Sequence, residues 1–248
     1  MHHGPAGLAD VVPVAWRLCD EIVHLTLEQA RRAGRRVPCR KGCNACCRYL
    51  VPLSVPEVFR LWRDIQTLPR LERLALLAGF QGSALRIIEA ARRNPPVSRA
   101  HPEGAPDDAI LSAAGGWYAA LRLDCPLLAE DLCRLYEHRP LACRAYHVVS
   151  DPRYCHDPGA GPGERLAVPV SPVQALCRLA AELEQAEPEA VLLPLAPMWA
   201  ASHLDRARRT WPLSQMVRRL VEILAAQAGR TFSPATPAGP VAVDEAPA

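Results

Sequence analysis

The stretch "CRKGCNACCR", residues 39–48, places four cysteines within nine positions. They are Cys39, Cys43, Cys46 and Cys47, in the pattern Cys-x3-Cys-x2-Cys-Cys. Spacings of three and four bring thiols to one side of a helical turn or around the rim of a tight loop. Disulfides, a metal site, a redox pair and core packing are the four interpretations to be weighed.

The composition argues against a disulfide framework. Ten of the 248 residues are cysteine, about 4%, whereas small disulfide scaffolds reach ~8–10%. The start of the chain, "MHHGPAGLADVVPVAW", lacks a basic segment followed by an apolar one, so we expect no signal peptide. No run approaches the ~18 apolar residues of a membrane span. We therefore expect a cytoplasmic protein, whose thiols stay reduced.

The small net charge disfavours nucleic acids and membrane surfaces as partners. The formal net charge is only +3, from 29 basic and 26 acidic residues, so we expect neither a nucleic-acid partner nor a membrane surface. The tightest basic run, within 31–41, is interpreted as the solvated end of a helix. A protein substrate or partner is left open.

The spacing of apolar residues predicts a mainly α fold. Helices are expected at 10–32 with a stop at Gly34, behind a capping box "SVPE" at 54–57, at 69–78 and 83–93, behind "SPVQ" at 171–174 as far as about 185, and at 213–228 before Gly229. A short strand is expected at 49–53.

Long irregular segments separate these helices. Residues 94–108 and 150–167 are loops by composition, and 116–128 is expected to be extended or weakly strand-like. We expect one domain over 1–230, with its motif region at 35–156, and a disordered Pro/Ala-rich tail over 231–248. Its helices would pack around a cysteine-rich metal-binding core, because coordination bonds can fix loops that lack an apolar core.

A second block, "CPLLAEDLCRLYEHRPLACRAYH" at 125–147, brings further thiols, and Cys155 follows it. Eight thiolates would fill two tetrahedral zinc sites, or four would hold an iron–sulfur cluster. The candidate metal ligands are Cys39, Cys43, Cys46, Cys47, Cys125, Cys133, Cys143 and Cys155.

Other residues receive different interpretations. Cys19 and Cys177 lie on predicted helices and are taken as small core residues. His147 and His156 are alternative ligands, although a surface role is favoured for both. Arg139 is expected to brace its loop by bonding backbone carbonyls.

The two blocks together resemble a known family. "CRKGCNACC" followed by "CPLL…LCRLYEHRPLACRAY" is similar to the YkgJ-type cysteine-cluster family, also described as the CxxCxxCC or zinc- or iron-chelating domain. The resemblance covers roughly 35–147, and the first spacing here is x3 rather than x2. It implies an intracellular bacterial metal-binding domain with zinc or iron. It also implies a distant kinship to the flagellin lysine N-methylase family, which is associated with S-adenosylmethionine.

Three functions follow as expectations. The first is a metal-binding protein whose two cysteine blocks converge on one buried zinc or iron–sulfur centre. The second is an S-adenosylmethionine-dependent protein lysine N-methyltransferase, which needs a ligand-sized pocket beside the cysteines. The third is a metal-handling or redox-sensing module, which needs partly exposed thiolates of low pKa. The sequence leaves open whether the protein is an enzyme.

Overall fold

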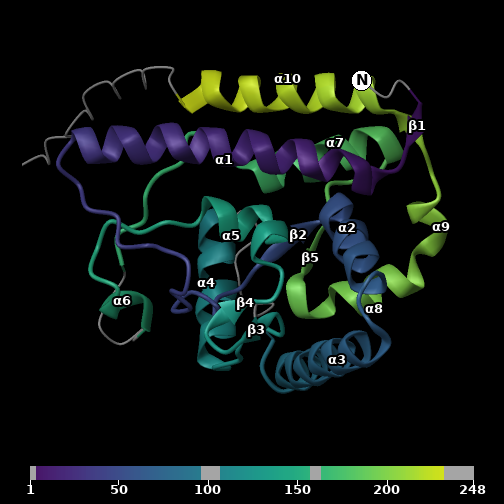
Figure 1. The fold of residues 1–248 in the computed structure, drawn as a ribbon, viewed down its shortest axis with the longest axis horizontal. Coiled ribbons are helices and arrows are strands. Elements are labelled where there is room, and N and C mark those ends of the chain that lie inside the picture. Colours follow the sequence, from purple (N-terminus) through teal and green to yellow (C-terminus); the bar gives the residue numbers. More distant parts are fainter. Residues whose placement is uncertain (1–3, 96–106, 157–162, 232–248) are drawn as a thin grey trace, which may run out of the picture.

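The structure is a computed structural model and describes residues 4–95, 107–156 and 163–231. Figure 1 shows a mainly helical protein, as the sequence predicts. Its helices are α1 (Leu8–Arg32), α2 (Val55–Gln66), α3 (Arg70–Arg93), α4 (Asp107–Ala120), α5 (Leu141–Ala145), α6 (Arg153–His156), α7 (Pro172–Glu184), α8 (Ala196–Ser202), α9 (Leu204–Ala207) and α10 (Leu213–Thr231). The described residues also form two 3-10 turns, η1 (Tyr136–His138) and η3 (Leu193–Leu195).

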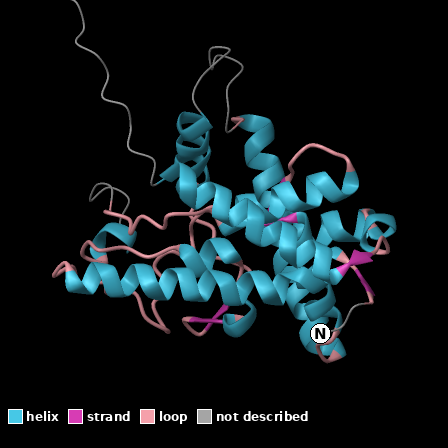
Figure 2. Cartoon of the chain, turned by 90° about the horizontal axis from the view of Figure 1, so that it is seen from above, coloured by secondary structure: helices cyan, strands magenta, loops and turns pink. Residues whose placement is uncertain are grey.

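The strands are short and form three antiparallel pairs, which Figure 2 shows among the helices. These pairs are β1 (Pro5–Ala6) with β6 (Trp211–Pro212), β2 (Pro52–Ser54) with β5 (Ala190–Leu192), and β3 (Leu128–Ala129) with β4 (Leu132–Cys133). The strand expected at 49–53 is β2, shifted toward the helix that follows it. It begins at Pro52, where a residue without an N–H donor is tolerated.

The main core surrounds α1. Helices α1 and α10 lie side by side across the top of Figure 1, and α2, α5 and α7 also pack against α1. Fully buried side chains from these helices include Val11, Ile65, Leu176, Met216 and Leu220. Because the apolar faces of five helices meet here, this region supplies most of the burial that stabilises the fold.

Glu57 is a buried carboxylate that joins two helices. Its Oε2 accepts hydrogen bonds from the Ser54 backbone N–H at 3.0 Å and the Ser54 hydroxyl at 2.8 Å. Its Oε1 accepts a bond of 2.8 Å from the N–H of Leu141, the first residue of α5. The predicted capping residue therefore also holds α5, the helix that carries Cys143.

The structure corrects several predicted boundaries. The two helices expected at 69–78 and 83–93 are one helix, α3, and the extended segment expected at 116–128 begins inside α4. A helical glycine costs only about 1 kcal/mol relative to alanine, so the buried residues Phe80 and Ile87 carry α3 through Gly79 and Gly82. In α4, packing of buried Tyr118 against Ile87 favours the helix.

The C-terminal prediction holds for the helix but not for its end. Met216, Leu220 and Leu224 are buried as expected, whereas Val221 is exposed and Gly229 lies inside α10. Of the tail expected over 231–248, the structure describes only Thr231, which ends α10. The loop expected at 94–108 lies mostly outside the described residues, and the loop expected at 150–167 contains the short helix α6.

Helix α3 differs from one further expectation. By length and composition alone it is apolar enough to cross a membrane, and it is the one helix in the described part of the chain that passes this test. Core helices pass the same test, and α3 packs Leu76 and Phe80 inward. Its outward side leaves Leu71 and Leu85 exposed.

We predict that Glu57→Gln lowers the free energy of unfolding by about 1–3 kcal/mol, because an amide group replaces an acceptor that faces buried donors. Burial raises the pKa of Glu57, so the stability that Glu57 contributes to the wild-type protein falls as pH rises through that pKa. The deficit of the variant should therefore narrow at higher pH. Urea denaturation across pH measures it, with exposed Glu72→Gln as the control; an equal loss in both variants would contradict the assigned role.

Candidate metal centre

The first cysteine block is a chain of tight turns. Helix α1 ends as predicted, because Gly34 has a φ of +72° and the Arg35 N–H bonds the Ala30 carbonyl at 2.9 Å. In the block itself, the Cys43 N–H bonds the Arg40 carbonyl at 3.0 Å. Gly42 has a φ of +87°, a conformation that favours glycine. The block is therefore a series of turns without regular secondary structure, and its four cysteines are half-buried.

Three hydrogen bonds join the first block to the start of the second. The Cys125 N–H donates to the Cys47 carbonyl at 2.8 Å. Asn44 Nδ2 donates to Asp131 Oδ1 at 2.5 Å. The third bond links Arg48 to Asp124 at 2.7 Å. Segments about eighty residues apart in sequence are therefore neighbours in the fold.

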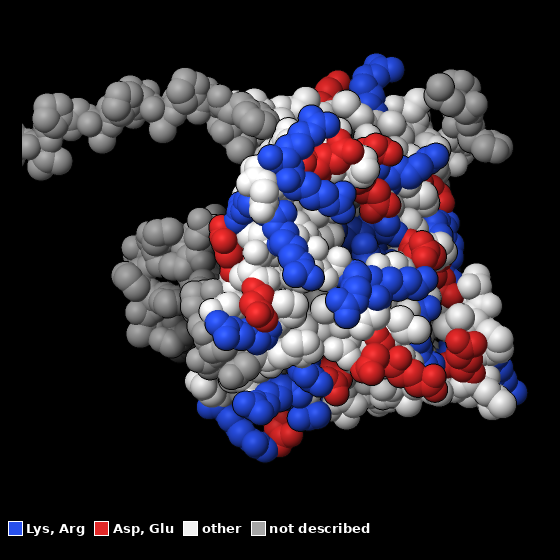
Figure 3. Space-filling view, turned by 60° about the vertical axis from the view of Figure 1, so that its left-hand side comes forward, with Lys and Arg blue, Asp and Glu red and all other residues white. Residues whose placement is uncertain are grey.

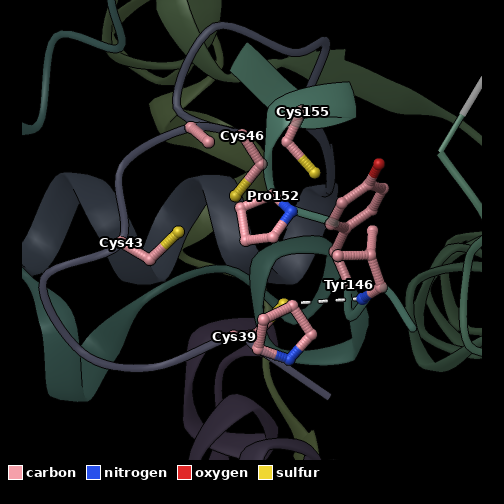
Figure 4. Close-up of a pocket in the computed structure, with 9 residues that line it drawn as sticks. Cys39, Cys43, Cys46, Tyr146, Pro152 and Cys155 are labelled. Carbon is pink, nitrogen blue, oxygen red and sulfur yellow. Dashed lines mark hydrogen bonds between the residues drawn. The ribbon is translucent and has the colours of Figure 1, made fainter. Parts of the chain in front are cut away.

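Four cysteines surround one small cavity. Cys39, Cys43, Cys46 and Cys155 line a space of about 20 Å³. Figure 4 shows the sulfurs of Cys43 and Cys46 turned toward each other, whereas the sulfur of Cys155 is turned toward Tyr146. The Val148 N–H donates to the Cys39 sulfur at 3.4 Å. The remaining lining residues are Pro38, Ala45, Tyr146, Val148 and Pro152, so sulfur and apolar groups dominate this site.

Cys155 reaches this cavity from α6, which lies in the segment expected to be a loop. The Tyr49 hydroxyl donates to the Cys155 carbonyl at 3.0 Å and ties α6 to the first block. The Tyr49 ring also packs edge-on against Tyr146, with centroids 5.8 Å apart. Sequence spacing alone could not place Cys155, because this contact spans more than one hundred residues.

A second group of thiols lies beside the first. Cys125 precedes the β3–β4 hairpin, Cys133 ends it and Cys143 is on α5. Cys143 interacts electrostatically with Cys125, Cys46 and Cys133. The Leu128 N–H donates to the Cys125 carbonyl at 2.9 Å, and the backbone groups of Leu127 and Leu128 act to lower the pKa of Cys125 against the larger effect of burial. Amide donors of this kind stabilise the negative charge of bound thiolates.

Burial raises the pKa of most of these thiols. It raises the pKa of Cys125 to about 12 and that of Cys143 well above its usual value. The pKa of Cys46 is also raised, chiefly by a hydrogen bond with Cys47 and then by burial. The thiols whose pKa is raised are Cys19, Cys39, Cys46, Cys125, Cys133, Cys143, Cys155 and Cys177. Without a metal these groups are protonated at neutral pH.

The clustered thiols are not arranged as the ligands of a metal ion. Across residues 4–95, 107–156 and 163–231, no three His, Cys, Asp or Glu side chains are arranged to hold a metal ion. All ten cysteines are free. A change of rotamer moves a cysteine sulfur by a few ångströms. Coordination would therefore require the sulfurs to rotate or the turns to contract.

Arg144, rather than Arg139, braces the loop of the second block. Its Nε donates to the Arg139 carbonyl at 3.0 Å, another N–H donates to the Glu137 carbonyl, and Nη1 pairs with Asp20 on α1 at 2.7 Å. The Arg139 guanidinium instead lies 4.4 Å from the ring centroid of Tyr136. The expectation failed because Arg144 lies on the single turn of α5, from where its guanidinium reaches the carbonyls of Glu137 and Arg139.

The remaining predicted residues divide clearly. Cys19 is fully buried in the main core, and Cys177 is buried on α7, as expected for packing residues. His147 is half-buried, and burial followed by Arg139 lowers its pKa. Its Nδ1 has no hydrogen-bond partner among the described residues. His156 is exposed at the end of α6.

The face turned forward in Figure 3 carries no single field of charge. Basic and acidic side chains are interspersed across it. Near the first block in sequence, Arg35 pairs with Glu164 and Lys41 pairs with Glu137. This distribution fits the small net charge.

Comparison with known proteins adds no relative. No family model, no curated protein and no solved structure matches this chain. The resemblance to the cysteine-cluster family stays a prediction from its motifs.

We predict that Gly42→Ala lowers stability by about 1–2 kcal/mol, because alanine is strained at a φ of +87°. Gly82→Ala on α3 is the matched control, since a Cβ meets no atom within 4 Å at either position. The control should be neutral or gain up to ~1 kcal/mol from helix propensity. Thermal unfolding measures both, and a Gly42→Ala variant as stable as the wild type would contradict the account of this turn.

Proposed function

We propose that the chain is a cytoplasmic metal-binding protein that holds zinc or an iron–sulfur cluster through its two cysteine blocks. The observation that carries the proposal is the meeting of thiols from three separate segments at one end of the fold. Cys39, Cys43 and Cys46 come from the first block, Cys125 and its neighbours from the second, and Cys155 from α6.

The surroundings of the thiols suit bound thiolates. The Val148 N–H donates to the Cys39 sulfur, backbone groups of Leu127 and Leu128 act to lower the pKa of Cys125, and the positive charge of Arg139 acts on both Cys46 and Cys133. A set of four thiolates around Zn²⁺ or a [4Fe–4S]²⁺ core carries a formal charge of −2. Amide donors and a nearby guanidinium offset such a charge.

The weak local core supports a structural role for the metal. In the described part of the chain, Ala45, Val148 and Cys155 form a small buried cluster around the first cysteine group, with Cys39, Cys43 and Tyr146 packed against it, and this cluster is separate from the main core. Burying a few small side chains supplies only a few kcal/mol. Metal coordination would provide the further stabilisation that these turns need.

The two other functions have less support. The cavity beside the sulfurs is about 20 Å³, whereas sites for small-molecule ligands measure roughly 300–1,000 Å³, so it does not accommodate S-adenosylmethionine. Reactive redox cysteines need a lowered pKa, and the pKa of Cys155 and of Cys39 is raised. The resemblance to the zinc- or iron-chelating family favours the first proposal.

Anaerobic purification with elemental analysis and a visible spectrum tests the proposal. Stoichiometric zinc in colourless protein, or iron with broad absorption near 400 nm, supports it. Cys43→Ser should lose metal and cooperative unfolding of this end together. Cys177→Ala, a buried cysteine on α7, is the control and should keep its metal. A wild-type protein that takes up neither zinc nor iron would overturn the proposal.

A further inference from the structure

We propose that the outward side of α3 is a docking surface for a second copy of this chain, and that two α3 helices pack antiparallel across a two-fold axis. This surface is defined by Leu71, Leu74, Ala78 and Leu85, and we call it the outer face of α3. The inference goes beyond the proposed metal binding and does not depend on it.

Helix α3 carries apolar residues on two opposite sides. Its inner side is buried and consists of Leu76, Phe80, Ala84 and Ile87. On the outer face, Leu71, Leu74 and Leu85 are 82%, 52% and 60% exposed. Leu71, Ala78 and Leu85 recur every heptad, which places them on one side of the helix. Only 22% of the most apolar window of α3 is buried, so the described residues leave a second apolar stripe uncovered.

The centre of the outer face has room for another helix. Figure 1 shows α3 at the lower edge of the molecule, and this helix packs against η3 and α8. Ala75 and Ala78 are exposed between the leucines, and a Cβ added at the neighbouring Gly79 would meet no atom within 4 Å. Small side chains at a contact let two helix axes approach closely. The leucines of a second α3 can therefore reach the small residues of the first.

The charges beside the outer face make it complementary to itself. Glu72 follows Leu71, and Arg86 follows Leu85 two heptads later. Both charged side chains are exposed, and neither forms an ion pair with another described residue. In an antiparallel pair, Leu71 and Leu74 of one copy pack near Leu85 of the other, and Glu72 then lies beside Arg86. The two-fold axis repeats this ion pair on the other half of the interface.

The same charges disfavour a parallel pair. In that arrangement Glu72 would lie beside Glu72 of the second copy and Arg86 beside Arg86, which places like charges together. The antiparallel arrangement joins opposite charges while it buries the leucines. The charge pattern therefore favours a second copy as the occupant and also sets its orientation.

A second copy fits this face better than a membrane surface does. Helices that lie on membranes carry Lys and Arg on the polar face, where they bind anionic lipid headgroups. Glu89 lies four residues after Leu85 and so on the same side of α3, where it would meet those headgroups. In the antiparallel pair Glu89 instead approaches the first turn of the second α3, where Arg70 and the helix dipole favour an acidic neighbour.

The expected dimer is weak. Helix α3 has 24 residues, which gives a contact about 36 Å long. One pair of helices of this length forms an interface at the small end of the range for specific complexes, so we expect a dissociation constant on the order of micromolar. The contact forms between copies and contributes nothing to the stability of a single copy.

Sedimentation velocity of the full chain at about 1 to about 300 µM tests the dimer. The wild type should shift from monomer toward dimer across this range. Leu74→Glu should raise the dissociation constant about tenfold or more, because it places a carboxylate in the apolar contact. Leu25→Glu on α1, where the leucine is 57% exposed, is the matched control and should dimerise like the wild type. A wild type that stays monomeric, or a dimer that Leu74→Glu leaves intact, would overturn the inference.

Co-sedimentation with phosphatidylserine vesicles tests the other occupant. The wild-type chain should stay in the supernatant at the same concentrations. Sedimentation with the vesicles that Leu74→Glu abolishes would assign the outer face to a membrane and overturn the inference.

Reversal of charge tests the orientation. Glu72→Arg and Arg86→Glu should each weaken the dimer, because each creates like-charged neighbours at two places in the interface. The double variant should regain the wild-type dissociation constant, since antiparallel pairing again joins opposite charges. A parallel dimer would gain nothing from the double variant, so a double variant as weak as either single variant would overturn the antiparallel arrangement. Far-ultraviolet circular dichroism checks that each variant keeps its helices.

Discussion

Among the described residues, the part of the molecule that carries the first cysteine group and Cys155 buries very little apolar surface: its buried residues are Ala45, Val148 and Cys155. The helices around α1 pack against one another in the main core. The turns at 38–49 and the segment around α6 lie outside this core. A folded domain is stable by only about 5–15 kcal/mol in total. Segments without a core of their own therefore need other bonds to keep one conformation.

Polar contacts link this end to the helical core. Glu57 connects α2 to α5, and Arg144 connects α5 to Asp20 on α1. The Arg144 guanidinium also lies 5.1 Å from the ring centroid of Trp16. The Arg60 guanidinium contacts the same ring, at 5.0 Å from its centroid. Helix α5 has only five residues, too few to be stable alone. The second cysteine group thus takes its position from the core through buried hydrogen bonds.

Local features could be predicted from sequence where local chemistry decides them. Ser54 and Glu57 form the predicted capping box of α2, and Gly34 ends α1. The box predicted at 171–174 forms only in part: the Ser171 side chain accepts the Gln174 N–H, but the Ser171 N–H bonds Gln227 in place of Gln174. Prediction failed where tertiary packing prevails, as in the continuation of α3 through Gly79 and the helical state of Tyr118.

The candidate site divides along the same line. The dense spacing of the first block marked its cysteines, because four thiols in nine positions is a local signal. The grouping of Cys155 with that block depends on a hydrogen bond from Tyr49 that no spacing reveals. The bracing role predicted for Arg139 belongs to Arg144, because Arg144 on the short helix α5 donates to the Arg139 carbonyl.

Hydrogen exchange of the metal-loaded and the chelator-stripped protein tests the central dependence most directly. If metal bonds replace the missing core, stripping should remove protection from the amides of 38–49 and 146–156, while α1, α5, α7 and α10 stay protected. Equal protection of the cysteine segments before and after metal removal would contradict the account.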